Sequence, residues 1–404
     1  MSNSSDDQAI AICDPARERK SISRRDGLKA LAAASLVPFM TRSANAQNAK
    51  TIRLAQVQAL TGPSAEHGLR ARDGAIFAAE ELNKSLGVKD KAGRSYKLEL
   101  VDSDMGNDPR QAITLLRNYA DDPNVVCVLG PTNSVGFLPM APVAAQFKIP
   151  VIGNGSGASI KEWNDWVYRV NPTSAVATPT LIKKLVDRHK VKRLAIIFDQ
   201  TQEVQAGDAA ICRRVASELG YTIVSDEAFK SGDQDFSAQI TKVKFSNADA
   251  LFLAAAPGDG AKAAAQIAEA GLKMPMMTGF GAFQDPVYWD NSGGTIKGGY
   301  TWIAQDLGRA SGALGQWTKI YGARFRLEAT IQSAFGYDSV YAFAAALKEC
   351  NEPSRELIHN ALKKLVTTTP IGTTIEFRNP PSGDNLKPTV TIVQVTGRGT
   401  YDVV

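Results

Sequence analysis

The sequence is poor in the side chains that carry much of enzyme chemistry, because its 404 residues include only three histidines and four cysteines. The histidines, His67, His189 and His359, are far apart, so no cluster is predicted that could bind a metal ion or relay a proton. The three cysteines after residue 46 are widely spaced, which matches neither a metal motif nor a disulfide framework. We therefore expect neither a metal nor a cofactor.

Patterns typical of hydrolases and of nucleotide-binding enzymes are also missing. Ser156 is flanked by Asn154 and Ala158, where the nucleophile elbow of a hydrolase has glycines. Gly153-x-Gly155-x-x-Ala158 is a variant of the dinucleotide fingerprint, but the next predicted strand begins too soon for the long helix that this motif requires. These absences predict that the protein is not an enzyme.

The composition shows no strong excess of charge and no repeated or low-complexity segment. The formal net charge is +5, part of which comes from the first 46 residues, so no nucleic acid or other polyanion is expected as a partner. Hydrophobic residues make up 44% and charged residues 22%, as in ordinary globular proteins. A chain of 404 residues exceeds what one core usually organises, which predicts two lobes.

The first 46 residues have the order of an export signal. The pair Arg24-Arg25 precedes a modestly apolar stretch at 30–40, and small residues at 44–46 form a cleavage pattern. The apolar stretch is shorter than the roughly 20 residues needed to cross a bilayer. Cys13 lies upstream of the arginines, so no lipid anchor is predicted. We expect a twin-arginine-type signal cleaved after about Ala46, and a periplasmic protein without membrane insertion.

After residue 50 the apolar pattern alternates between strands and helices. Strands are predicted at 51–59, 98–102, 125–129, 150–153, 167–170, 194–198, 222–225, 250–254, 275–278, 299–303, 374–377 and 389–395. Helices are predicted at 69–86, 109–119, 138–147, 177–189, 208–219, 236–245, 259–270, 314–325, 335–349 and 354–365. This order predicts an α/β fold with two successive doubly wound, mostly parallel sheets.

Two loops that follow neighbouring predicted strands are made almost entirely of glycine and small polar residues. They span residues 130–134 and 155–159. Ligands of such folds collect at the carboxyl ends of the parallel strands. Main-chain N–H groups and hydroxyls in these loops could bind a carboxylate without a cationic side chain. An ordinary strand-to-helix turn is the alternative for each loop alone.

Several short motifs, and the order in which they follow one another along the chain, resemble those of one family. They are residues 60–68 (LTGPSAEHG), Leu129-Gly130-Pro131 with Ser134, 148–152 (KIPVI) with 157–159, 168–172 (YRVNP), 271–273 (GLK) and 336–340 (GYDSV). The chain resembles type I periplasmic binding proteins of the leucine/isoleucine/valine-binding class, which deliver solutes to ABC importers. The resemblance implies a monomer that works with an ABC permease in the inner membrane.

The same resemblance implies two α/β lobes joined by three crossing segments, with the ligand in the cleft between them. The expected N-terminal lobe comprises 47–171 and about 299–375, and the C-terminal lobe 172–298 and about 376–404. It further implies that Ser134, with the small loop at Gly157 and Ser159, holds the carboxylate of a ligand. The complete set of expected ligand-binding residues is His67, Asn133, Ser134, Gly157, Ala158, Ser159, Gln202, Glu203, Pro257 and Phe280.

The sequence departs from the amino-acid binders of this family at one important position. Where they place an acidic residue for the ammonium of the ligand, Phe280 stands here. An unpaired ammonium in a closed cleft costs several kcal/mol, so we expect a small carboxylate ligand with an aromatic or aliphatic body. An amino acid or amide bound through Glu203 or Asp259 stays open, as do a ligand-sensing regulatory domain and an exported enzyme.

Overall fold

The computed structural model describes residues 50–62, 64–84, 86–157, 164–279, 282–284, 286–378 and 382–404. The predicted export signal and its cleavage point lie outside the described residues. Within the described ranges, no helix is both long and apolar enough to cross a membrane.

The first lobe is built on a six-stranded sheet in the order β2-β3-β1-β4-β5-β6. Its strands are β1 (Lys50–Gln58), β2 (Val88–Lys89), β3 (Ser95–Asp104), β4 (Val125–Leu129), β5 (Val151–Gly153) and β6 (Val167–Arg169). All neighbouring pairs are parallel except β2 with β3. The carboxyl ends of β1, β4, β5 and β6 therefore lie along one edge of this sheet.

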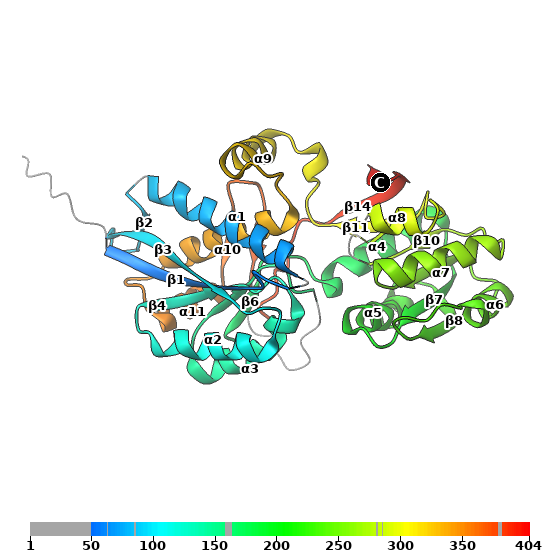
Figure 1. Ribbon diagram of the computed structural model, residues 1–404, viewed down its shortest axis with the longest axis horizontal. Helices are drawn as coiled ribbons and strands as arrows, with labels where there is room; N and C mark the ends of the chain where they lie inside the picture. The colour runs from blue at the N-terminus through cyan, green and yellow to red at the C-terminus, as the bar shows by residue number, and fades with distance from the viewer. Residues whose placement is uncertain are drawn as a thin grey trace, which may run out of the picture. The chain divides into compact units, whose positions relative to one another are not determined.

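Helices cover both faces of this sheet (Figure 1). They are α1 (Ala65–Lys84), α2 (Pro109–Asp121), α3 (Ser134–Phe147), α9 (Gly312–Phe325), α10 (Ile331–Lys348) and α11 (Arg355–Leu362). Side chains alternate along β1: Ile52 and Leu54 pack in the core beneath α1 and α10, whereas Ala55 and Val57 pack in the core beneath α2 and α3. Both faces are apolar, as expected for a buried parallel sheet.

The second lobe is built on a seven-stranded sheet in the order β15-β14-β11-β10-β9-β7-β8. Its strands are β7 (Arg193–Asp199), β8 (Thr222–Phe229), β9 (Ala250–Ala254), β10 (Met276–Met277), β11 (Tyr300–Ile303), β14 (Thr391–Gly397) and β15 (Thr400–Val403). The strands from β8 to β11 are parallel, and β14 and β15 add an antiparallel edge. The predicted α/β fold with two doubly wound lobes is confirmed.

Helices of the second lobe also lie on both sheet faces. They are α4 (Ser174–His189), α5 (Glu203–Leu219), α6 (Ser237–Phe245), α7 (Pro257–Glu269) and α8 (Pro286–Asn291). On β7, Leu194 and Ile196 join one core with α4 and α5, and Ala195 and Ile197 join the other with α6 and α7. The short elements η1 (Ala282–Gln284), η2 (Leu307–Arg309), β12 (Val366–Thr368) and β13 (Thr374–Glu376) complete the fold.

The chain passes between the two sheets three times. It leaves the first sheet after β6, returns after β11 and leaves again after β13. β11 lies in the seven-stranded sheet, so the return begins after Ile303 rather than near residue 299. Phe377 packs in a core of the first lobe, so the last crossing follows residue 377.

Two glycines bring α1 and α10 into direct backbone contact. A Cβ atom at Gly74 would lie 1.9 Å from the carbonyl oxygen of Ser333, and one at Gly336 would lie 1.9 Å from the carbonyl oxygen of Ala71. No side chain fits at either point, so the two helices cross more closely than any other residue would allow. Gly336 of the sequence motif GYDSV is therefore a packing residue.

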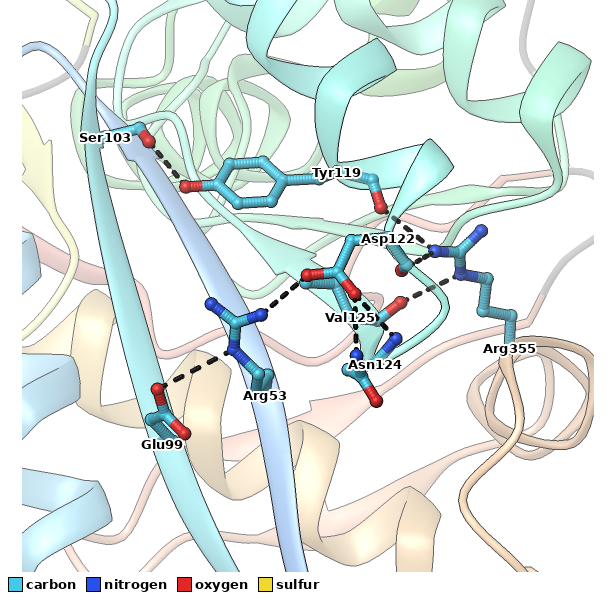
Figure 2. A network of polar contacts seen from close by, with 8 residues as sticks. All are labelled: Arg53, Glu99, Ser103, Tyr119, Asp122, Asn124, Val125 and Arg355. Carbon is cyan, nitrogen blue, oxygen red and sulfur yellow. Dashed lines mark hydrogen bonds and ion pairs between the residues drawn. The ribbon is translucent and has the colours of Figure 1, made fainter.

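One arginine joins α11 to the end of α2 (Figure 2). The guanidinium of Arg355 donates hydrogen bonds to four main-chain carbonyls. These belong to Tyr119, Ala120, Asp122 and Val125, at 3.0, 2.7, 2.6 and 2.8 Å. The Asp122 carboxylate in turn accepts from Arg53 of β1 at 2.6 Å. Main-chain carbonyls at the end of α2 and the start of β4 are thus bound by a residue more than 200 positions away in the chain.

Asp338 of α10 is a carboxyl group buried beneath the second crossing segment. Its exposed fraction is 1%. Burial raises the pKa of Asp338 to about 7, although the hydroxyls of Thr369 and Thr373 lower it in part. The side chain of Gln305, in the second crossing segment, donates to the Thr373 hydroxyl. This carboxyl therefore titrates close to neutral pH, within the packed part of the lobe.

We expect Gly336→Ala to destabilise the protein by at least about 1–3 kcal/mol, because the added methyl group overlaps the backbone of α1. The matched control is Gly207→Ala in α5, where nothing lies within 4 Å of the added atom. That change should leave the free energy of unfolding unchanged or raise it by up to about 1 kcal/mol. Urea unfolding measures both, and equal effects of the two substitutions would contradict the close helix contact.

Asp338 should make stability depend on pH. Its pKa is about 3.9 in an unfolded chain and about 7 in the folded protein. The folded state therefore binds the proton more tightly, and its contribution to stability is lost as the pH rises toward 7. Relative to the wild type, Asp338→Asn should gain about 2–3 kcal/mol between pH 5 and pH 8. Urea unfolding at both pH values tests this, and a constant difference would contradict it.

Candidate functional site

A cavity of about 270 Å³ lies at the carboxyl edge of the six-stranded sheet. Both loops singled out from the sequence contribute to it, together with the starts of α1, α4 and α5. Its lining residues are His67, Thr132, Asn133, Ser134, Gly155, Gly157, Asn171, Pro172, Ser174, Val204, Trp302, Gln332 and Phe335. Among these described residues none is Asp, Glu, Lys or Arg, so the cavity wall is polar through hydroxyls, amides and main-chain groups.

The loop after β4 presents the N-terminus of α3. Asn133 is the N-cap: its Oδ1 accepts from the N–H of Gly136 at 3.0 Å, and its Nδ2 donates to Asn107 Oδ1 at 2.9 Å. Ser134 is the first residue of the helix, and its Oγ lies 3.1 Å from Ser156 Oγ in the second loop. The Asn133 side chain is thus engaged in capping, while Ser134 lies where the helix end favours an anion.

The end of β5 and the loop that follows it need two of their glycines for packing. A Cβ atom at Gly153 would lie 2.5 Å from the Phe137 ring, and one at Gly155 would lie 2.6 Å from the carbonyl oxygen of Thr132. At Gly157 an added Cβ atom would have no neighbour within 4 Å. Gly153, the last residue of β5, therefore lets the strand end lie against α3, and Gly155 lets the loop lie against the β4 loop. Gly157 leaves space open at the cavity.

A buried ion pair positions the second loop. Arg169 has an exposed fraction of 1%, and its Nε and Nη2 lie 2.6 and 3.0 Å from the two carboxylate oxygens of Asp384. Arg169 Nη1 also donates to the carbonyl oxygen of Ser156 at 3.2 Å, and Asn171 Nδ2 donates to the same oxygen at 3.0 Å. The crossing segments after β6 and β13 thus both hold the loop that carries Ser156.

Two buried polar atoms of lining residues have no partner within the described chain. They are Thr132 Oγ1 and Asn171 Oδ1, on side chains with exposed fractions of 6% and 2%. Buried polar groups are normally hydrogen-bonded, so an unpaired hydroxyl and amide oxygen on one cavity indicate a place for a polar ligand or a water molecule.

Four of the ten predicted ligand-binding residues line this cavity: His67, Asn133, Ser134 and Gly157. Gln202, Glu203 and Pro257 are not among its lining residues, although Val204 beside Glu203 is. Ala158, Ser159 and Phe280 lie outside the described residues.

Two second-lobe residues, the predicted ligand-binding residue Gln202 and the alternative acid Asp259, have partners of their own. Gln202 Nε2 donates to Ser231 Oγ at 3.0 Å. The carboxylate of Asp259 accepts from the N–H of Gly232 at 2.9 Å and lies 3.4 Å from Lys262 Nζ. Asp259 is therefore engaged in holding a loop. The described residues contain no group of three or more His, Cys, Asp or Glu arranged to hold a metal ion.

Nine lining residues were not in the predicted set: Thr132, Gly155, Asn171, Pro172, Ser174, Val204, Trp302, Gln332 and Phe335. Thr132 and Asn171 belong to motifs that the sequence already singled out, and their polar character next to a strand end was the available signal. Trp302 and Phe335 are buried aromatic residues, with exposed fractions of 1% and 5%, and resemble ordinary core positions in the sequence.

A model of the periplasmic binding protein family matches residues 51–400. This match spans most of the chain, which therefore belongs to that family. The predicted family is confirmed. The fold and the cavity point to the same class, the substrate-binding proteins.

Curated relatives include two amino-acid-binding proteins. The Leu/Ile/Val-binding protein BraC3 of Rhizobium johnstonii is 26% identical over 317 residues, which cover 74% of this chain and 84% of the relative. The leucine-, isoleucine-, valine-, threonine- and alanine-binding protein of Pseudomonas aeruginosa is 28% identical over 198 residues, 48% of this chain and 51% of that protein. The match thus spans about half the length of the Pseudomonas relative.

Solved structures share the fold. The leucine-binding protein LivK of Thermotoga maritima has a TM-score of 0.70 at 22% identity, covering 87% of this chain and 97% of that one. A solute-binding protein of an ABC transporter from Rhodopseudomonas palustris BisB5, in complex with 3,4-dihydroxybenzoic acid, has a TM-score of 0.66 at 21% identity, covering 85% and 93%.

We expect Thr132→Val to separate stability from binding. Its buried hydroxyl has no partner, so removal should leave the free energy of unfolding unchanged or raise it by up to about 1–2 kcal/mol. Affinity for the ligand identified in the screen below should fall about tenfold or more, because a hydrogen bond to the ligand is lost. Thr114→Val, on the exposed side of α2, is the control. Lost stability with unchanged affinity would show that Thr132 has only a structural role.

Proposed function

We propose that this protein is the extracytoplasmic receptor of an ABC importer, and that it binds a small solute through a carboxylate. The observation that carries the proposal is the meeting of two strand-end loops at one cavity. Ser134, at the N-terminus of α3, and the unpaired hydroxyl of Thr132 both line it. A helix N-terminus with hydroxyl donors stabilises an anion without a positively charged side chain.

The remaining wall suits an apolar body. Trp302, Phe335 and Val204 also line the cavity. A volume of about 270 Å³ is near the lower end of the usual size of small-molecule sites, roughly 300–1,000 Å³. Branched-chain amino acids, which both curated relatives are named for, have a carboxylate and a body of this kind. We propose them as the first ligand class.

A second candidate is an aromatic acid. The aromatic side chains of Trp302 and Phe335 in the wall favour it. The Rhodopseudomonas palustris neighbour, in complex with 3,4-dihydroxybenzoic acid, shows that this fold accepts such a ligand. Both candidates place the carboxylate at the two loops, and they differ in whether an ammonium group must also be bound.

The mechanism follows from two lobes joined by three crossing segments. A ligand that contacts both lobes stabilises the closed form relative to open forms, by an amount set by its difference in affinity for the two. Ser134 belongs to the first lobe, and Ser174, Val204 and Trp302 belong to elements of the second. The closed form is the one we expect the permease in the inner membrane to recognise.

A thermal-shift and calorimetric screen tests the proposal on the purified protein. The probes are leucine, 4-methylpentanoate (leucine without its amine), isopentylamine (leucine without its carboxylate) and 3,4-dihydroxybenzoate. A ligand at 100 times its dissociation constant should stabilise the protein by about 2.7 kcal/mol. We expect binding only by probes that have a carboxylate. Binding of isopentylamine as tightly as leucine, or no binding by any carboxylate, would contradict the proposed function.

A further inference from the structure

A carboxylate for which the described residues supply no cationic partner lies directly behind the cavity wall. Asp208, in the second turn of α5, has an exposed fraction of 3%. Its Oδ1 accepts from the hydroxyl of Thr178 at 3.0 Å, and the hydroxyl of Ser174 is a second neighbour, which lowers the pKa of the carboxyl. Both hydroxyls lie on α4. Within the described part of the chain no Lys, Arg or His forms an ion pair with Asp208.

The partners of Asp208 extend to the cavity along two routes. Ser174 is itself a lining residue. Thr178 Oγ1 accepts from the indole N–H of Trp302 at 3.3 Å, and Trp302 is also a lining residue. On the route through Ser174, a single hydroxyl therefore separates the Asp208 carboxylate from the cavity.

The other oxygen of Asp208 lies against the loop after β10. A Cβ atom at Gly279 would lie 2.2 Å from Asp208 Oδ2, so only glycine leaves room for the carboxylate there. This loop continues to position 280, where the sequence has Phe280 instead of the acidic residue of the amino-acid binders. Asp208 thus places a carboxylate on α5, next to the loop after β10, which has Phe280 in place of an acidic residue.

The burial of this charge requires an explanation. Among the described residues the neighbours that favour its ionised form are the hydroxyls of Ser174 and Thr178, and an ionised carboxylate without a cationic partner is costly away from water. Burial raises the pKa of Asp208 to about 6, although the hydroxyls of Ser174 and Thr178 lower it in part. The ionisable group that faces it is the buried Cys212 thiol, one turn further along α5. A positive charge brought by a ligand would compensate the carboxylate.

We propose that Asp208 is the positioning residue that selects ligands with an ammonium group, acting through Ser174. This inference rests on the proposed function. A Ser174 hydroxyl that donates its proton to Asp208 keeps its oxygen lone pairs free to accept a hydrogen bond from an ammonium in the cavity. The charge behind Ser174 strengthens that bond and supplies the negative potential that the uncharged cavity wall lacks.

Isothermal titration calorimetry with leucine and 4-methylpentanoate tests this inference, because the two probes differ in the ammonium group. For Asp208→Asn we expect the affinity for leucine to fall at least tenfold and the affinity for 4-methylpentanoate to stay the same or rise. Asp338→Asn is the matched control, since it also removes a fully buried carboxyl group of raised pKa. It should change neither affinity.

A second variant keeps the test decisive if Asp208→Asn fails to fold. Ser174→Ala removes the hydroxyl that we place between the carboxylate and the ligand, and it should lower the preference for leucine over 4-methylpentanoate in the same way. A merely structural role of Asp208 would weaken both probes equally. Equal losses, or an unchanged preference in a folded Asp208→Asn protein, would overturn the inference.

The wild-type protein separates the failure of this inference from that of the proposed function. Binding of 4-methylpentanoate without binding of leucine would overturn the role of Asp208, while the carboxylate receptor would stand. Binding of neither probe nor of 3,4-dihydroxybenzoate would overturn the proposed function and the inference together.

Discussion

The buried ion pair between Arg169 and Asp384 is the contact on which the candidate site depends. A guanidinium that is 1% exposed is tolerable only when it is paired and hydrogen-bonded, and here Asp384 and the carbonyl oxygen of Ser156 fulfil both conditions. The same guanidinium lies 5.5 Å from the centre of the Phe137 ring in α3. It therefore joins β6, the third crossing segment, the β5 loop and α3 at one point.

This arrangement would let an uncharged cavity wall bind the charged ligand that we propose. The charged groups are placed one residue layer behind the wall, where they fix or polarise the groups that line it. Arg169 fixes the loop of Ser156, whose hydroxyl contacts Ser134. Asp208 orients the hydroxyls of Ser174 and Thr178. The wall itself presents hydroxyls, amides and main-chain groups that need little reorganisation when a ligand arrives.

Much of the fold was predictable because its core strands are short, wholly apolar and bounded by turn residues. Val125–Leu129 and Ala250–Ala254 have the predicted bounds. Two helix starts at the cavity were predicted too late: α3 begins at Ser134 rather than near Leu138, and α5 at Glu203 rather than Asp208. These first turns lie at the ligand end of the sheets. They carry polar residues, so the apolar period that marks a helix is absent there.

The candidate site was predictable only in part, for a related reason. Small polar residues after two neighbouring strands indicated the loops, since parallel strands end at one edge of the sheet. Trp302 and Phe335 reach the cavity from elements that are distant in the sequence, and their aromatic character could not distinguish a wall from a core. Gly153 is required by its contact with Phe137 of α3 and Gly155 by its contact with Thr132 of the β4 loop, and a single sequence reveals neither contact.

The order of strands in the second sheet links its edge to the first lobe. β7, β8, β9 and β10 pair with neighbours that are close in the chain, whereas β11 pairs with β14 some 90 residues later. Contacts of such long separation carry a cost in loop-closure entropy. Here the intervening segment is α9 to β13, which packs in the first lobe. A folded first lobe therefore lowers the entropic cost of pairing β11 with β14, and we expect the two lobes to unfold as coupled rather than independent units.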